Sequence, residues 1–154
     1  MANTIVPAEL LQSSGGNIKI GSTAGDSVTT GTDNVVIGDT AGTAVTTGAD
    51  NTFVGDSAGA ATTTADSNTA VGANALASIV STTGNTGIGY HAGYAATGGE
   101  NTIVGADAGY YLVGTDSVHV GVETGKFATG SYNTFVGAEA GKGGTTSAPF
   151  SSGG

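Results

Sequence analysis

The chain has 154 residues, of which 29 are glycine and only 10% are charged, and twelve acidic residues against three basic ones give a net charge of −9. This acidic balance leaves few cations to neutralise phosphates, which argues against nucleic acid and anionic membrane surfaces as partners. The chain has no cysteine, so disulfides and thiolate metal sites are excluded.

Residues 1–16 precede a strongly repetitive body. This segment has neither a basic start nor a long apolar run, so it predicts neither a secretion signal nor a membrane span. We expect it to cap the first repeat, as terminal segments of repeat proteins do, or to dock onto a larger assembly. The candidate attachment residues are its apolar side chains: Ile5, Val6, Leu10 and Leu11.

From residue 17 a motif recurs, best seen in the stretch Asn51-Thr-Phe-Val-Gly-Asp-Ser-Ala-Gly59. A short fixed period predicts stacked coils, one per copy. We therefore predict an all-β fold, a parallel β-roll or β-solenoid of about eight 16–17-residue coils over residues 17–141. With the leading residue as position one, coils one to eight begin at Asn17, Asn34, Asn51, Asn68, Asn85, Asn101, Ser117 and Asn133.

Positions two and four of the motif are Val, Ile or Thr in every copy. β-branched residues favour a strand, and residues two apart in a strand share a face. We expect both positions to point into the lumen and position four to form the solenoid core. The predicted core residues are Ile20, Ile37, Val54, Val71, Ile88, Val104, Val120 and Val136.

Position three accepts residues as different as Lys19 and Phe53. Such a column is not expected inside one chain, so we place it on the outside, facing solvent or another copy. Because a thin lumen buries little apolar surface per residue, we predict that stability requires lateral association with other copies. The candidate residues for this contact are Phe53, Ile103 and Phe135.

Three other positions are nearly invariant among the copies. Position one is Asn in seven of the eight, which predicts an amide ladder along the axis. Position five is always Gly, which predicts a corner. Position eight is Ala except at Thr124, which predicts a second, narrow inward site.

The second half of the chain differs from the first. Coil four has Leu76 where the other coils have Gly, which marks a join between coils of 17 and 16 residues. We expect residues 142–154 to form a flexible Gly/Ser-rich tail. Coils five to eight carry most of the aromatic residues, for which we favour a role in trimer packing over a ligand-binding patch: Tyr90, Tyr94, Tyr110, Tyr111, Phe127, Tyr132 and Phe135.

The sequence offers no recognisable catalytic arrangement. His91 and His119 lie in different columns with no carboxylate at catalytic spacing, and the acidic residues fall mainly at expected turns. We therefore expect no enzyme activity, no cofactor and no metal site. The threonine column at position two resembles an ice-binding array, but we expect it to face inward and to be unable to bind ice.

The run NTxVGxxAG with a Thr/Gly-rich spacer resembles the head repeats of trimeric autotransporter adhesins (YadA-like heads). It is closer to the NTAIG-type repeats of phage fibres and spikes, and the resemblance covers residues 17–141. It implies a left-handed parallel β-roll with three chains packed around a threefold axis. Together with the expected lateral association, the resemblance predicts an obligate homotrimer, with Phe53, Ile103 and Phe135 as the candidate trimer interface.

These observations lead us to expect a non-enzymatic structural protein at the surface of a phage virion. The expected form is a short trimeric spike or capsid decoration (cement-type) protein, bound to itself and to a capsid or tail protein. The alternative is a tail-fibre or receptor-binding module whose aromatic half contacts a host surface glycan. A bacterial adhesin head at the cell surface is a third class, disfavoured because we find neither a secretion signal nor a membrane anchor.

Overall fold

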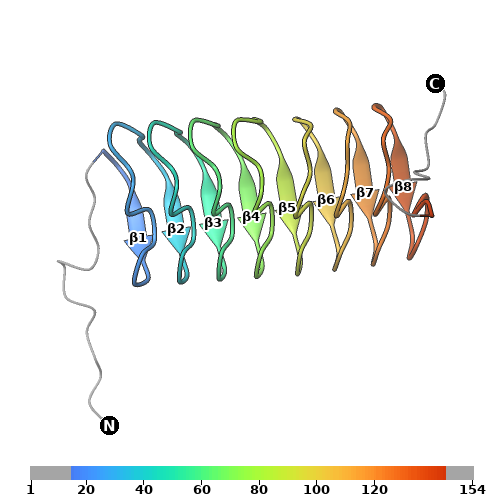
Figure 1. Ribbon diagram of the computed structural model, residues 1–154, viewed down its shortest axis with the longest axis horizontal. Helices are drawn as coiled ribbons and strands as arrows, with labels where there is room; N and C mark the ends of the chain where they lie inside the picture. Colours follow the sequence, from blue (N-terminus) through green and yellow to red (C-terminus); the bar gives the residue numbers. More distant parts are fainter. Residues whose placement is uncertain (1–14, 145–154) are drawn as a thin grey trace, which may run out of the picture.

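A computed structural model describes residues 15–144, and they form a parallel β-solenoid (Figure 1). Each coil contributes one three-residue strand. Within the described range no helix is long and apolar enough to cross a membrane. The strands are β1 (Ile18–Ile20), β2 (Val35–Ile37), β3 (Thr52–Val54), β4 (Thr69–Val71), β5 (Thr86–Ile88), β6 (Thr102–Val104), β7 (Val118–Val120) and β8 (Thr134–Val136).

Each strand pairs in parallel with the next, giving one sheet in the order β1 to β8. Equivalent residues of successive copies are direct partners; Phe53 of β3, for example, pairs with Val36 and Ala70. The predicted stacking of the copies is therefore confirmed. Most of the expected N-terminal segment 1–16 and of the expected tail 142–154 lies outside the described residues, including the candidate attachment residues Ile5, Val6, Leu10 and Leu11.

The predicted orientation of the strands is wrong. Position three points into the lumen, where Phe53 and Ile103 are both 0% exposed and Phe135 packs against the buried cluster. These three residues therefore do not form a trimer interface. Position four faces outward instead, and it is part-exposed or exposed at all eight predicted core residues: Ile20, Ile37, Val54, Val71, Ile88, Val104, Val120 and Val136.

The alternation of side chains explains this error. A period of two shows which residues share a face, but it does not show which face is inside. The outward assignment of position three rested on Lys19, which lies in the first coil and donates from its Nζ to the carbonyl of Gly25 at 2.8 Å. The ammonium group is thus satisfied at the end of the stack, and a Lys in this column does not exclude the lumen.

The asparagine column confirms the predicted ladder and is buried. In coil three, the Nδ2 of Asn51 donates to the Oδ1 of Asn34 at 3.0 Å and to the carbonyl of Ala65 at 2.8 Å. The backbone N–H of Asn51 donates to the same Asn34 oxygen. Buried polar groups need hydrogen-bond partners, and the Asn side chains find theirs in the adjacent coil and in the Thr/Gly-rich return of their own coil.

Small residues in other columns make room for the variable position three. A Cβ added at Gly59 would lie 2.7 Å from the ring of Phe53, so the large side chain occupies space that the glycine leaves. In coil five the relation is reversed. Gly87 occupies position three, and a Cβ there would meet the Cγ of Leu76 at 2.7 Å. The lumen therefore stays filled although individual residues differ in size.

The corners behave as the sequence predicts. Gly55, at position five, has a φ of +135°, and an added Cβ would lie 2.5 Å from the carbonyl oxygen of Gly72 in the next coil. A side chain is excluded there by both conformation and space. The position-eight alanines are buried from Ala24 to Ala108, as is Thr124 in coil seven.

Candidate functional site

The outer face of the sheet is an uncharged stripe running the length of the solenoid, formed by positions two and four of all eight strands. Its residues are only Val, Ile and Thr. Several of them are well exposed: Val71 to 37%, Ile88 to 41% and Val136 to 68%. We call these two columns the outer stripe. An uncharged surface of this length, rich in exposed aliphatic side chains, is a candidate interaction site.

The outward orientation also changes the assessment of ice binding. The threonine column was excluded from that role because it was expected to face the lumen, and that reason is wrong. Thr52, Thr69 and Thr86 are part-exposed, and Thr102 is exposed, on the outer stripe. They alternate along each strand with Val or Ile at position four, so the surface is a mixed array of hydroxyl and aliphatic groups.

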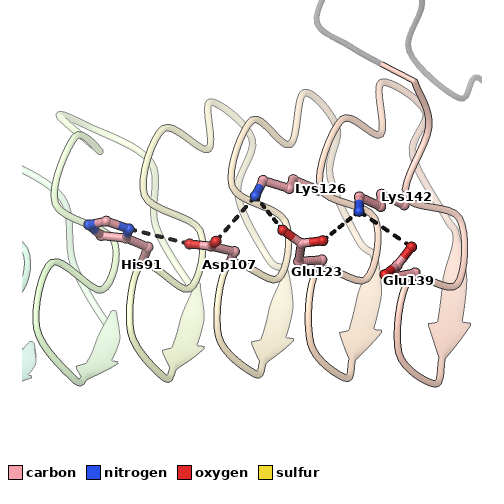
Figure 2. A network of polar contacts seen from close by, with 6 residues as sticks. All are labelled: His91, Asp107, Glu123, Lys126, Glu139 and Lys142. Carbon is pink, nitrogen blue, oxygen red and sulfur yellow. Dashed lines mark hydrogen bonds and ion pairs between the residues drawn. The ribbon is translucent and has the colours of Figure 1, made fainter.

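A second surface lies on the turn after the strands, where a chain of ion pairs, extended by a hydrogen-bonding contact between His91 and Asp107, crosses coils five to eight (Figure 2). Position seven supplies His91 and three carboxylates, and position ten supplies two lysines. Each lysine bridges two carboxylates, Lys126 at 2.7 and 3.1 Å and Lys142 at 2.5 and 3.3 Å. The members are His91, Asp107, Glu123, Lys126, Glu139 and Lys142.

These contacts shift the pKa values of Glu123, Lys126 and Lys142 in the direction expected for ion pairs. Hydrogen bonds from Lys126 and Lys142 lower the pKa of Glu123 to about 2. The pKa of each lysine is raised, chiefly by its hydrogen bond to Glu123. Glu123, Lys126 and Lys142 therefore stay charged from neutral pH to well below pH 4.5.

Aromatic rings stack along the same turn. The rings of Tyr94 and Tyr110, both at position ten, lie 4.9 Å apart, and those of Tyr111 and Phe127, at position eleven, lie 5.5 Å apart. The Nζ of Lys126 sits 5.8 Å from the ring centre of Tyr110. We call these rings and the ion-pair chain the aromatic corner. Its rings recur at positions ten and eleven of successive coils, and this column spacing is the sequence signal for their stacking.

The two histidines are not brought together. His91 contacts Asp107 at 3.3 Å on the part-exposed turn, whereas His119 is 0% exposed in the lumen. No group of three or more His, Cys, Asp or Glu residues suited to a metal occurs within residues 15–144. Four acidic residues expected at turns do adopt positive φ: Asp33, Asp50, Asp107 and Asp116.

The signal that would have oriented the strands was present in the sequence. Positions one and three share a face, so a buried Asn ladder at position one requires position three to be inward.

No protein-family model matches the chain, and searches of curated proteins and of solved structures found no match either.

Proposed function

We propose that this chain is a non-enzymatic structural protein of a phage particle, acting as a short trimeric spike or capsid decoration protein. The observation that carries the trimer is the outer stripe. The resemblance of the motif to fibre and spike repeats supports the viral role. The threefold arrangement and the left-handed coil are part of this proposal.

The outer stripe suits contact with two further copies of the same chain. Positions two and four carry no charged residue in any of the eight strands, whereas the chain of ion pairs lies on a different side of the coil. The columns of the outer stripe repeat at the strand spacing of about 4.8 Å, so an identical copy offers a matching periodicity over its whole length. Burying β-branched side chains there adds to the apolar surface that the thin lumen buries.

The test places a charge in the middle of the outer stripe. Val71→Glu should yield monomers, because a carboxylate buried among Val and Ile side chains is strongly unfavourable. Asn74→Glu is the matched control, since position seven accepts Glu in coils seven and eight. Sedimentation velocity of both variants reads the result. A Val71→Glu protein that assembles like the control would contradict the interface.

An ice-binding monomer is the competing outcome for the same face. If the wild-type chain is monomeric and shows thermal hysteresis in a freezing assay, the outer stripe faces ice rather than other copies. If it is trimeric without thermal hysteresis, the structural role stands. The viral role itself is tested by imaging the particle: several hundred copies over the shell support decoration, and a few copies at the tail support a fibre.

The aromatic corner favours a second candidate function, that of a receptor-binding module that contacts a host surface glycan. Coils one to four have only small or polar residues at positions ten and eleven, so the solenoid does not require rings there. Tyr111 of the corner remains 40% exposed, and the neighbouring Tyr90, whose ring lies 3.8 Å from that of His91, remains 55% exposed. Exposed tyrosine faces combine apolar area with a hydroxyl group, which is typical of recognition surfaces.

The glycan hypothesis is tested by binding the full chain to a glycan array. Tyr111→Ala should abolish any binding, while Tyr132→Ala, which changes an exposed tyrosine outside the corner, should leave it unchanged. Absence of binding by the wild-type protein, or equal loss in both variants, would contradict a receptor role for this corner.

A further inference from the structure

The lumen contains one titratable side chain that none of the functions above uses. His119 occupies position three of coil seven, between Ile103 of β6 and Phe135 of β8. It is 0% exposed, and its ring meets that of Phe135 at 5.2 Å in an edge-on geometry. Within residues 15–144 neither ring nitrogen has a hydrogen-bond partner of normal geometry.

The surroundings of His119 offer a charged imidazole little stabilisation. The residues packed against the ring carry no charge: Ile103, Phe135, Thr124 and Gly125, whose added Cβ would lie 1.9 Å from the ring. Burial lowers the pKa of His119, and the backbone of Thr124 opposes this shift only in part. No carboxylate is among the buried residues of the described range.

The charged groups nearest in the chain are occupied elsewhere. Glu123 and Lys126 flank the turn that covers the ring, but they pair with each other at 2.7 Å on the part-exposed side. Asp107 precedes the equivalent turn of coil six and pairs with Lys126, and Lys142 of coil eight pairs with Glu123. Strands β6, β7 and β8 carry no other titratable side chain.

We propose that His119 makes the C-terminal end of the solenoid open in acid. Protonation of its imidazole places an unpaired positive charge in a dry lumen, and coils seven and eight separate from the stack to let water reach it. Strand β8 pairs only with β7 among the described strands, so few contacts oppose this opening. The opening lies within one chain and does not depend on how copies associate.

The direction of the effect follows from linkage. A base whose pKa is lower in the folded state binds its proton mainly when the coil is open, so acid favours opening. The effect begins as the pH falls below the ordinary histidine value of about 6.5. At pH 4.5, two units lower, it reaches at most about 100-fold in the opening equilibrium. Glu123, with its pKa of about 2, stays charged throughout this interval, so the ion pairs of coil seven are not the cause.

Hydrogen exchange by mass spectrometry on the full chain tests the proposal, after correction for the pH dependence of intrinsic exchange. Between pH 7.0 and 4.5, amide protection in residues 117–141 should fall severalfold or more, up to about 100-fold, while residues 34–84 keep theirs. His119→Phe should remove the pH dependence, since Phe53 and Phe135 occupy the same column. His91→Asn should leave it intact, because Asn74 occupies that column.

Loss of protection in His119→Phe equal to that of the wild type would overturn the proposal, as would undiminished protection of the wild type at pH 4.5. If His119→Phe does not fold, the imidazole proton signal of His119 in the wild type decides. It should keep its neutral position until protection is lost. A ring that takes up its proton near pH 6.5 with protection unchanged contradicts an acid-opened end.

Discussion

At the scale of single residues, the asparagine ladder links each coil to the next through buried hydrogen bonds. The Oδ1 of Asn51 accepts two hydrogen bonds from Asn68 of the next coil, from its backbone N–H at 3.0 Å and from its Nδ2 at 3.2 Å. The Nδ2 of Asn51 donates to the Oδ1 of Asn34 in the preceding coil and to the carbonyl of Ala65 in its own coil. The residues that carry these groups are all buried, so the groups depend on one another for hydrogen bonds. The side chain of Asn51 therefore has a structural role.

Asn51→Ala should therefore be strongly destabilising. It leaves the N–H of Asn68 and the carbonyl of Ala65 without these partners, and each unsatisfied buried group costs about 1–3 kcal/mol. Asn51→Ser should cost less, because Ser117 holds the same position in coil seven and its Oγ accepts the N–H of Asn133. Urea unfolding at fixed protein concentration measures both. Equal, small losses would show that the ladder contributes little.

A second residue-scale prediction concerns Glu123. Its pKa of about 2 lies below the ordinary value near 4.3, so its ion pairs stabilise the fold above pH 4.3 and are lost as the pH falls towards 2. The unfolding free energy of Glu123→Gln should thus fall less steeply between pH 4.5 and 2.5 than that of the wild type. Glu139→Gln, which removes the exposed end of the chain of ion pairs, should retain most of the wild-type slope.

At the scale of elements, the strand of each coil and its register were predictable, but its orientation was not inferred correctly. β-branched columns identify the strand, yet they occur here on the outside, where Val71 and Ile88 are exposed. The buried column is the variable one, because Phe53 is matched by Gly59 and Gly87 by Leu76. Complementary sizes in different coils are hard to recognise from a sequence, since they depend on which columns touch across the lumen.

This complementarity makes a prediction about Leu76 and Gly87. Leu76→Ala opens a cavity and should cost about 2–5 kcal/mol, and Gly87→Ala overpacks the site and should cost about 1–3 kcal/mol. The double variant should cost less than the sum by about 0.5–3 kcal/mol, because the new methyl group enters the space that Leu76 leaves. A double-mutant cycle of urea unfolding measures the coupling. Strict additivity would mean that the two sites do not touch.

At the scale of the whole molecule, the outer stripe and the aromatic corner divide the surface by chemistry. The stripe is uncharged and follows every strand, while the corner is confined to coils five to eight and holds both lysines of that half. A trimer assembled through the stripe leaves the corner accessible. The sequence predicted the association from the thin lumen, but it assigned the contact to residues that the fold buries within one chain.

Sedimentation equilibrium of the full chain is the most direct test of this association. The chain mass is 14.6 kDa, so three copies give 3 × 14.6, or about 44 kDa. We predict this mass at micromolar concentration for the folded protein, with no change on dilution before unfolding begins. A folded species of 14.6 kDa would contradict the proposal that the outer stripe is the interface with two further copies.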